Sequence, residues 1–173
     1  MSRNRYHTII VSIMMLFSAP LLAAPPEQAA AIKQQPISIY ADRLSIDDTT
    51  GISLYHGHVE LQQGDLNFSG DELEITQKEG TIILMQAKGQ PAHFKRRNPE
   101  PLRAQAMRID YDNDKGEVIL RGEAQLWQNG DQFSGEIIHY YIDSRRVQAQ
   151  GDSQGKQGSG RVHVLIRPKE DRK

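Results

Sequence analysis

One stretch of this sequence occurs twice, and the repeat limits what the chain can fold into. Residues Gly51 to Ile75 match residues Gly116 to Tyr140 without a gap. The identical pairs are Gly51 and Gly116, Gly57 and Gly122, Leu61 and Leu126, Gln63 and Gln128, and Phe68-Ser69-Gly70 and Phe133-Ser134-Gly135. A match at fixed spacing is the signature of one supersecondary unit stacked on a second copy of itself. The sequence therefore predicts a fold with two internal repeats.

Apolar and polar residues alternate over short runs from Pro36 onward. Glycine, proline or paired Asp and Asn residues separate the runs, as between strands joined by tight turns, and no window of helical length shows a helical period. We therefore expect an all-β fold. The expected strands are Ile37–Tyr40, Arg43–Asp47, Ile52–Gln62, Leu66–Phe68, Glu72–Thr76, Thr81–Lys88, Ala92–Lys95, Leu102–Ala106, Arg108–Tyr111, Glu117–Gln128, Asp131–Phe133, Ile137–Asp143, Arg146–Gln150 and Arg161–Arg167.

The alternation also assigns faces to the strands. In the first copy Val59 and Leu61 share one face, and the histidines between the apolar residues take the other. The apolar parity changes at Gly70-Asp71 and at the equivalent Gly135-Glu136, which predicts a bulge or corner there. About a dozen short strands with one apolar face fit a single folded antiparallel sheet, a β-jelly roll or a sandwich.

The apolar face is mainly aliphatic, because aromatic residues make up only 6% of the chain. A closed core usually contains bulkier side chains. Two alternatives therefore stay open: an interior left partly open for an apolar guest, and a tightly packed sandwich.

The N-terminus has the pattern of a secretory signal. Two arginines precede an apolar run from Ile9 to Leu22, and Ala23-Ala24 follow it. The run is shorter than the roughly 20 apolar residues that a spanning helix needs. An uncleaved anchor is the alternative, because leucine stands where a cleavage site usually has a small residue. The expected organisation is a signal peptide at 1–23, a flexible arm at 24–35, one domain at 36–168 and a disordered tail at 169–173.

The sequence lacks the motifs of common enzyme classes: it has no cysteine, no G-x-S-x-G elbow and no P-loop. His56 and His58 form an H-x-H that could open a cupin-like zinc site, but zinc needs three or four convergent ligands. Solvated histidines on a polar strand face are the preferred interpretation. We expect no catalytic residue, no cofactor and no metal. The net charge of −1 also argues against nucleic acid as a partner, because phosphate binding needs a basic excess.

A basic run, Lys95-Arg96-Arg97, lies in an expected loop between the repeats. These three cations are candidate contacts for phosphates or for acidic groups of a partner. A solvated loop that discourages aggregation is the alternative.

Four segments carry a resemblance to a known family. They are Gln35-Pro36-Ile37-Ser38-Ile39-Tyr40-Ala41-Asp42, Tyr55-His56-Gly57-His58-Val59 with Gln63-Gly64, Gly89-Gln90-Pro91-Ala92-His93-Phe94, and Arg121-Gly122-Glu123-Ala124. In this order the chain resembles the OstA-like family of periplasmic lipopolysaccharide-transport proteins, from about Gln35 to Pro168. The resemblance implies a folded antiparallel sheet, or β-jelly roll, whose cleft accepts acyl chains. It also implies a carrier that joins end to end through edge strands and links inner-membrane and outer-membrane transport components.

With the strand faces, the resemblance implies a set of groove residues and no catalytic ones. The expected lipid-binding groove contains Ile37, Ile39, Ile46, Val59, Leu61, Phe68, Phe94, Tyr111, Leu126, Phe133 and Tyr140. Lys95, Arg96 and Arg97 are the candidate phosphate contacts. The implied partners are lipopolysaccharide, the membrane components of its transport, and further copies of the chain, joined head to tail near Ile37–Tyr40 and Arg161–Arg167.

Three other functions stay open at this point. The imperfect signal keeps a membrane-anchored, LptC-like component of the same pathway as an alternative. A cupin-like metal enzyme would bind metal at His56 and His58. A periplasmic scaffold would bind only proteins through its edge strands. The glycine-rich stretch from Gly151 to Gly160 departs from the family and bears on the C-terminal junction.

Overall fold

The computed structural model describes residues 35–98, 100–152 and 160–168. The all-β prediction is confirmed: this part of the chain contains β1 (Ile37–Tyr40), β2 (Arg43–Asp47), β3 (Ile52–Gln63), β4 (Leu66–Lys78), β5 (Thr81–Arg96), β6 (Leu102–Asp112), β7 (Glu117–Gln128), β8 (Asp131–Tyr141), β9 (Arg146–Gln150) and β10 (His163–Leu165). Within it no helix is long and apolar enough to span a bilayer. The predictions for 1–23, for 24–34 and for the tail at 169–173 lie outside the described residues.

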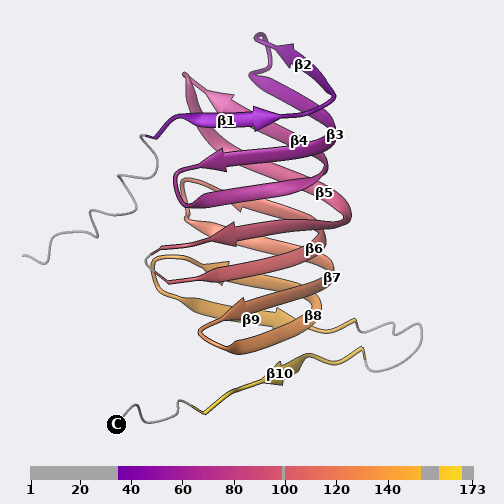
Figure 1. The fold of residues 1–173 in the computed structure, drawn as a ribbon, viewed down its shortest axis with the longest axis vertical. Coiled ribbons are helices and arrows are strands. Elements are labelled where there is room, and N and C mark those ends of the chain that lie inside the picture. Colours follow the sequence, from indigo (N-terminus) through magenta and orange to yellow (C-terminus); the bar gives the residue numbers. More distant parts are fainter. Residues whose placement is uncertain (1–34, 99, 153–159, 169–173) are drawn as a thin grey trace, which may run out of the picture.

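All ten strands form one antiparallel sheet that does not close on itself (Figure 1). The long strands β3 to β8 are neighbours in chain order. At one end of the sheet, β3 pairs with β1 through residues 60–63 and with β2 through residues 52–56. At the other end, β8 pairs with β10 through residues 132–134 and with β9 through residues 137–141. Each of these two long strands therefore has two short partners, one for each half of its length.

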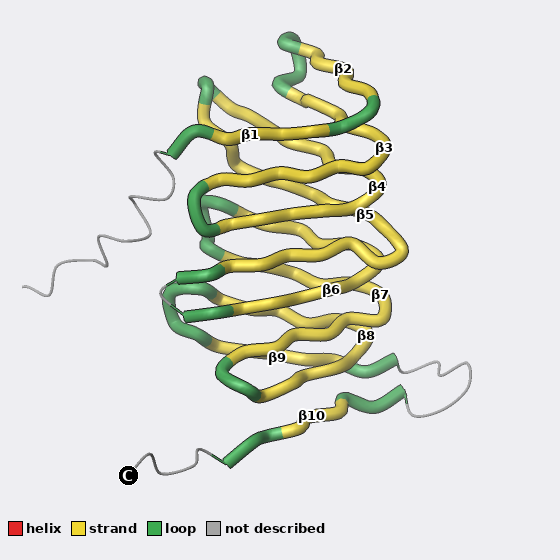
Figure 2. The backbone as a smooth tube through the Cα atoms, in the orientation of Figure 1, coloured by secondary structure: helices red, strands yellow, loops and turns green. Residues whose placement is uncertain are grey.

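The sheet is folded lengthwise into two layers. The long strands bend from one layer to the other along one side, here called the fold line, and most turns lie on the opposite side, here called the mouth (Figure 2). The first half-sheet consists of β1, β10 and residues 59–63, 66–70, 92–96, 102–106, 124–128 and 131–135. The second half-sheet consists of β2, β9 and the remaining parts of β3 to β8.

The fold line is built the same way in both copies of the repeat. In β3 the ladder shifts at Gly57 and His58, whose φ angles are 80° and 47°, and in β7 at Gly122 and Glu123, with φ angles of 76° and 50°. A positive φ is readily adopted only by glycine. Both glycines therefore recur in the sequence because each copy bends its strand by the same backbone conformation.

The corner predicted at Gly70-Asp71 is confirmed, since the ladder between β4 and β5 shifts between Ser69 and Glu72. The prediction that strands end there is wrong. The paired short runs expected within 66–76, 81–95, 102–111 and 131–143 are the single strands β4, β5, β6 and β8, because a bulge interrupts the ladder without ending the strand. The last strand, β10, is shorter than the expected run Arg161–Arg167.

The inner faces of the two half-sheets pack against each other. Phe68 and Phe94 of the first half-sheet have ring centroids 4.8 Å apart, and Phe94 lies 6.4 Å from Tyr111 of the second. The buried apolar residues are at most 5% exposed: Val59, Leu61, Leu66, Phe68, Leu73, Ile75, Met85, Ala87, Ala92, Phe94, Leu102, Ala104, Ala106, Ile109, Tyr111, Val118, Leu120, Ala124, Leu126, Ile138 and Tyr140. Side chains lining a lipid-sized void would be exposed, so in this state the middle of the interior is packed.

Candidate functional site

Ten of the eleven residues expected in the groove lie together on the inner faces. Those that are fully buried in the core are Val59, Leu61, Phe68, Phe94, Tyr111, Leu126 and Tyr140. Ile37 and Ile39 of β1 and Phe133 of β8 are partly buried and pack against this core. The inner face is therefore apolar from one end of the sheet to the other.

Ile46 is the exception, because it is 58% exposed and outside the core. It pairs with Ser53, and Leu44 pairs with Tyr55, which packs against the core, so β2 continues the inner face. Since β2 is the last strand of the second half-sheet, no further strand of the described chain covers it. The apolar inner face is therefore exposed to solvent at this end of the sheet.

The opposite end of the sheet also leaves apolar residues uncovered. Val164 of β10 pairs with Phe133 and is 43% exposed, and Ile166 is 70% exposed. Like β1, β10 has a partner on only one side among the described strands. Free backbone donors and acceptors of this kind can pair with a strand of another chain.

At the mouth, one ion pair joins the two half-sheets. Arg145 Nη1, in the turn between β8 and β9, donates to Glu100 Oε1, in the connection between β5 and β6, over 2.9 Å. Glu100 Oε2 is buried and lacks a hydrogen-bond partner in the described part of the chain. Neither residue was expected in the site, because nothing in the local pattern of either turn links it to the other.

Arg96 lies inside the mouth rather than in a loop. As the last residue of β5 it alternates to the inner face, is 6% exposed, and its buried Nε has no hydrogen-bond partner among the described residues. Burial raises the pKa of the Tyr111 hydroxyl, and the charge of Arg96 opposes that rise. The mouth therefore contains a guanidinium group directly beside the apolar core.

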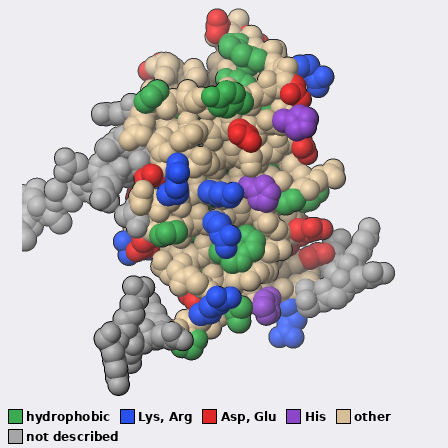
Figure 3. All heavy atoms as spheres, in the orientation of Figure 1, with side chains coloured by type: hydrophobic (Ala, Val, Ile, Leu, Met, Phe, Trp, Pro, Cys, Tyr) green, Lys and Arg blue, Asp and Glu red, His purple; other side chains and the backbone are tan. Residues whose placement is uncertain are grey.

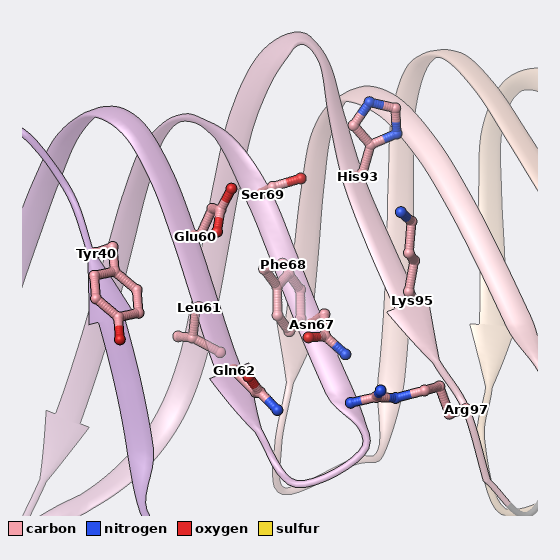
Figure 4. A pocket seen from close by; sticks show the side chains of 10 residues that line it. All are labelled: Tyr40, Glu60, Leu61, Gln62, Asn67, Phe68, Ser69, His93, Lys95 and Arg97. Carbon is pink, nitrogen blue, oxygen red and sulfur yellow. The ribbon is translucent and has the colours of Figure 1, made fainter.

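Lys95 and Arg97 occupy the opposite, outer face of the first half-sheet. They line a hollow of about 350 Å³ together with Tyr40, Glu60, Leu61, Gln62, Asn67, Phe68, Ser69 and His93 (Figure 4). The expectation of a basic loop is corrected, because β5 extends through Arg96 and its alternation separates the three cations. They cannot contact one phosphate as a unit.

His56 and His58 do not share a ligand site. His56 Nδ1 lies 3.4 Å from Glu72 Oε2, and the exposed His58 has its Nδ1 2.9 Å from Asp42 Oδ2. The hydrogen bond with Asp42 raises the pKa of His58. Within the ranges that the structure covers, no group of three or more His, Asp or Glu side chains is placed to hold a metal ion.

Comparisons with known proteins agree with this geometry. A family model described as LptA/(LptD N-terminal domain) LPS transport protein matches residues 38–146. The lipopolysaccharide export system protein LptH of Pseudomonas aeruginosa is 31% identical over 162 residues, which cover 89% of either chain. The export protein LptA of Escherichia coli K12 is 28% identical over 154 residues, covering 86% of this chain and 83% of that one.

A solved structure has the same fold. The crystal structure of Pseudomonas aeruginosa LptH, described as the LptA-homologous periplasmic component of the lipopolysaccharide transport device, aligns with a TM-score of 0.71 at 27% identity. The alignment covers 79% of this chain and 99% of that one. The chain therefore belongs to the family of LptA and LptD N-terminal-domain lipopolysaccharide transport proteins.

Proposed function

We propose that this protein carries lipopolysaccharide through the periplasm, with the acyl chains held between the two half-sheets and without catalysis. The observation that carries the proposal is the continuous apolar inner face, which runs from Leu44 and Ile46 of β2 through the core to Val164 of β10. Acyl chains need such a surface, and each buried CH₂ contributes about 0.8 kcal/mol.

Loading requires the half-sheets to separate, because core side chains such as Phe94 and Leu126 have no exposed surface. The layers are joined covalently along the fold line, so hinging there opens the mouth without breaking a strand ladder. The ion pair between Arg145 and Glu100 and the packing of the inner faces oppose this opening. Acyl chains replace the packing contacts that are lost.

The charged groups near the mouth are proposed to contact the phosphates of the lipid. Arg96 lies at the inner rim, where a head group attached to buried acyl chains must emerge. Lys95 and Arg97 lie on the outer side of the same rim. The three cations would therefore act at separate positions, and Arg96 is the one nearest to the acyl chains.

The free edges support assembly with other proteins of the same transport route. Copies of the chain would join head to tail, β10 of one to β1 of the next, by strand addition. The inner faces would then continue from copy to copy. The two ends of such an assembly would meet the inner-membrane and outer-membrane components, and the protein would then act as a bridge across the periplasm.

Photo-crosslinking tests the lipid-binding surface. Benzoylphenylalanine at Phe94 and at Phe133, both on inner faces, should capture lipopolysaccharide in cells. The matched controls are Glu74 and Ile119, which face away from the core on the second half-sheet, apart from the charged rim. Crosslinks to lipopolysaccharide at these control positions alone would refute the proposed function.

A further inference from the structure

The outer faces of the two half-sheets differ in whether their cations have ion-pair partners. On the second half-sheet, Lys88 Nζ lies 2.5 Å from Glu72 Oε1, and Asp110 accepts from Arg108 at 2.7 Å and from Arg121 at 3.3 Å. Each of these three cations therefore has a carboxylate partner, Glu72 on the adjacent strand β4 for Lys88 and Asp110 on β6 for both arginines.

On the first half-sheet the cations have no such partners. Lys95, Arg97, Arg103 and Arg167 form no ion pair with any residue that the structure describes. Lys and Arg side chains gather over the middle of the face that carries β1 and β10 (Figure 3). The nearby turn acids already accept hydrogen bonds, Asp65 from the Asn98 amide and Asp131 from the backbone N–H of Arg167.

A second hollow, of about 450 Å³, lies within this cationic face. Trp127 lines this hollow, and the guanidinium carbon of Arg103 lies 5.5 Å from the centroid of the indole ring. Arg103 and Gln132 are the cross-strand neighbours of Trp127 on either side. Arg167 completes the cationic rim.

The hollow adjoins the apolar interior. Gln128 lines it, and the Gln128 side-chain amide donates to the hydroxyl of Tyr140, a residue with no exposed surface. A lipid whose chains lie beside Tyr140 would therefore emerge at this rim. Its head group would meet Trp127 and Arg103.

The lining fits an anionic sugar. A flat indole can stack against the apolar face of a sugar ring, the amides of Gln132 and Asn129 can bond hydroxyl groups, and guanidinium groups bind phosphate bidentately. The volume lies within the usual range for small-molecule sites. An acidic peptide would use the cations but would not need the ring and the amides together.

We propose that the hollow around Trp127 and Arg103 binds the phosphorylated saccharide part of the lipopolysaccharide whose acyl chains the interior holds. This inference rests on the proposed function for the identity of the ligand. It places the acyl chains and the saccharide of one lipopolysaccharide molecule on opposite faces of the first half-sheet. Acyl chains lie against its inner face, and the saccharide lies over its outer face.

Trp127 is the only tryptophan of the chain, so its fluorescence reports on this hollow directly. The probe is the water-soluble oligosaccharide that remains after all acyl chains are removed from lipopolysaccharide, with its phosphates intact. We expect a saturable change in Trp127 emission with this probe. Dephosphorylation of the same oligosaccharide should abolish the change.

Arg103→Gln should weaken binding of the phosphorylated probe about tenfold, the usual value of one hydrogen bond to a charged group. Arg43→Gln removes an exposed positive charge from β2, on the second half-sheet, and should leave the binding constant unchanged. Melting curves of both variants check that the fold is intact.

No saturable change, equal binding of the dephosphorylated probe, or equal weakening by Arg43→Gln would overturn the inference. An equal response to a poly-glutamate peptide would assign the hollow to an acidic protein instead. Because the probe has no acyl chains, these results do not depend on the groove. Crosslinking at Phe94 by whole lipopolysaccharide tests the proposed function separately, so the two ideas can fail independently.

Discussion

Arg145 and Glu100 are the residues through which the two half-sheets meet in an ion pair at the mouth, with Nη1 and Oε1 2.9 Å apart. The side chain of Arg145 is 62% exposed and that of Glu100 is 25% exposed. The pair therefore connects a solvated turn of one layer to a more sheltered loop of the other. It is placed to resist opening of the mouth while contributing little to the stability of the sheet.

The first prediction concerns loss of this ion pair. Arg145→Gln should lower the free energy of unfolding by less than about 1 kcal/mol, because exposed ion pairs contribute little. Loss of the ion pair should lower the free energy of mouth opening by the same amount. Lipopolysaccharide should therefore be captured at Phe94 up to about fivefold faster. The time course of photo-crosslinking measures the rate, and urea unfolding measures the stability.

Arg146→Gln is the matched control for that variant. The Arg146 guanidinium stacks over the Tyr141 ring at 4.1 Å, a contact that stays within the second half-sheet. It should leave the capture rate unchanged. If Arg146→Gln accelerated capture as much as Arg145→Gln does, the ion pair would have no specific role at the mouth.

Most of the sheet can be predicted from the sequence, because the alternation of apolar and polar residues and the turn motifs are local features. The bounds of β1, β2, β7 and β9 match the expected runs, and the repeat predicted that Leu61 and Leu126 take equivalent inner positions. The corners at glycines were also predictable. The local pattern does not predict whether a strand continues through a corner, because that depends on the strands with which it pairs on both sides.

The contacts at the mouth could not be predicted from the sequence either, because they too depend on segments that are distant in the chain. Glu100 and Arg145 lie in turns of different layers, and only the fold brings them together. The expected strand Ala92–Lys95 leaves Arg96 in a loop, whereas β5 continues through Arg96 and turns its side chain inward. Ile46 lies on the predicted inner face but is exposed, because no further strand of the described chain covers it at this end of the sheet.

The second prediction tests the fold line at Gly57. A β-carbon there would meet the side chain of Asp42, and the residue has a φ of 80°. Gly57→Ala should destabilise the protein by about 1–3 kcal/mol for the backbone conformation, and by more for the displaced Asp42. Chemical denaturation measures the difference.

Gly80→Ala separates the two causes. Gly80 has a similar φ of 75°, and a β-carbon there would have nothing within 4 Å. It should show only the cost of the backbone conformation. A loss of stability in Gly80→Ala equal to that in Gly57→Ala would show that contact with Asp42 does not constrain the fold line.

The third prediction concerns pH. Because the hydrogen bond with Asp42 raises the pKa of His58 above its ordinary value of 6.5, the stabilisation is fully present below that value. It is lost as the pH rises through the higher pKa of the folded state. NMR titration of the His58 ring should show the raised pKa, and Asp42→Asn should return it towards 6.5.

Asp48→Asn is the control for this titration, because Asp48 is an exposed acid in the following turn that makes no hydrogen bond with His58. It should leave the His58 titration as in the unaltered protein. A His58 pKa that did not change in Asp42→Asn would mean that the contact between these side chains does not persist in solution.

The fourth prediction asks whether the mouth must open for lipid to enter. The chain has no cysteine, so Glu100→Cys and Arg145→Cys together provide a unique pair of thiols, which a short bismaleimide can join across the mouth. Joining them should reduce capture of lipopolysaccharide at Phe94 at least tenfold, because the layers can no longer separate there. Gln105→Cys with Gln125→Cys, which are neighbours within the first half-sheet, should react with the same reagent and keep full capture. Undiminished capture by the protein joined across the mouth would show that lipid enters from the ends of the sheet, past the exposed Leu44 and Ile46 or past Val164.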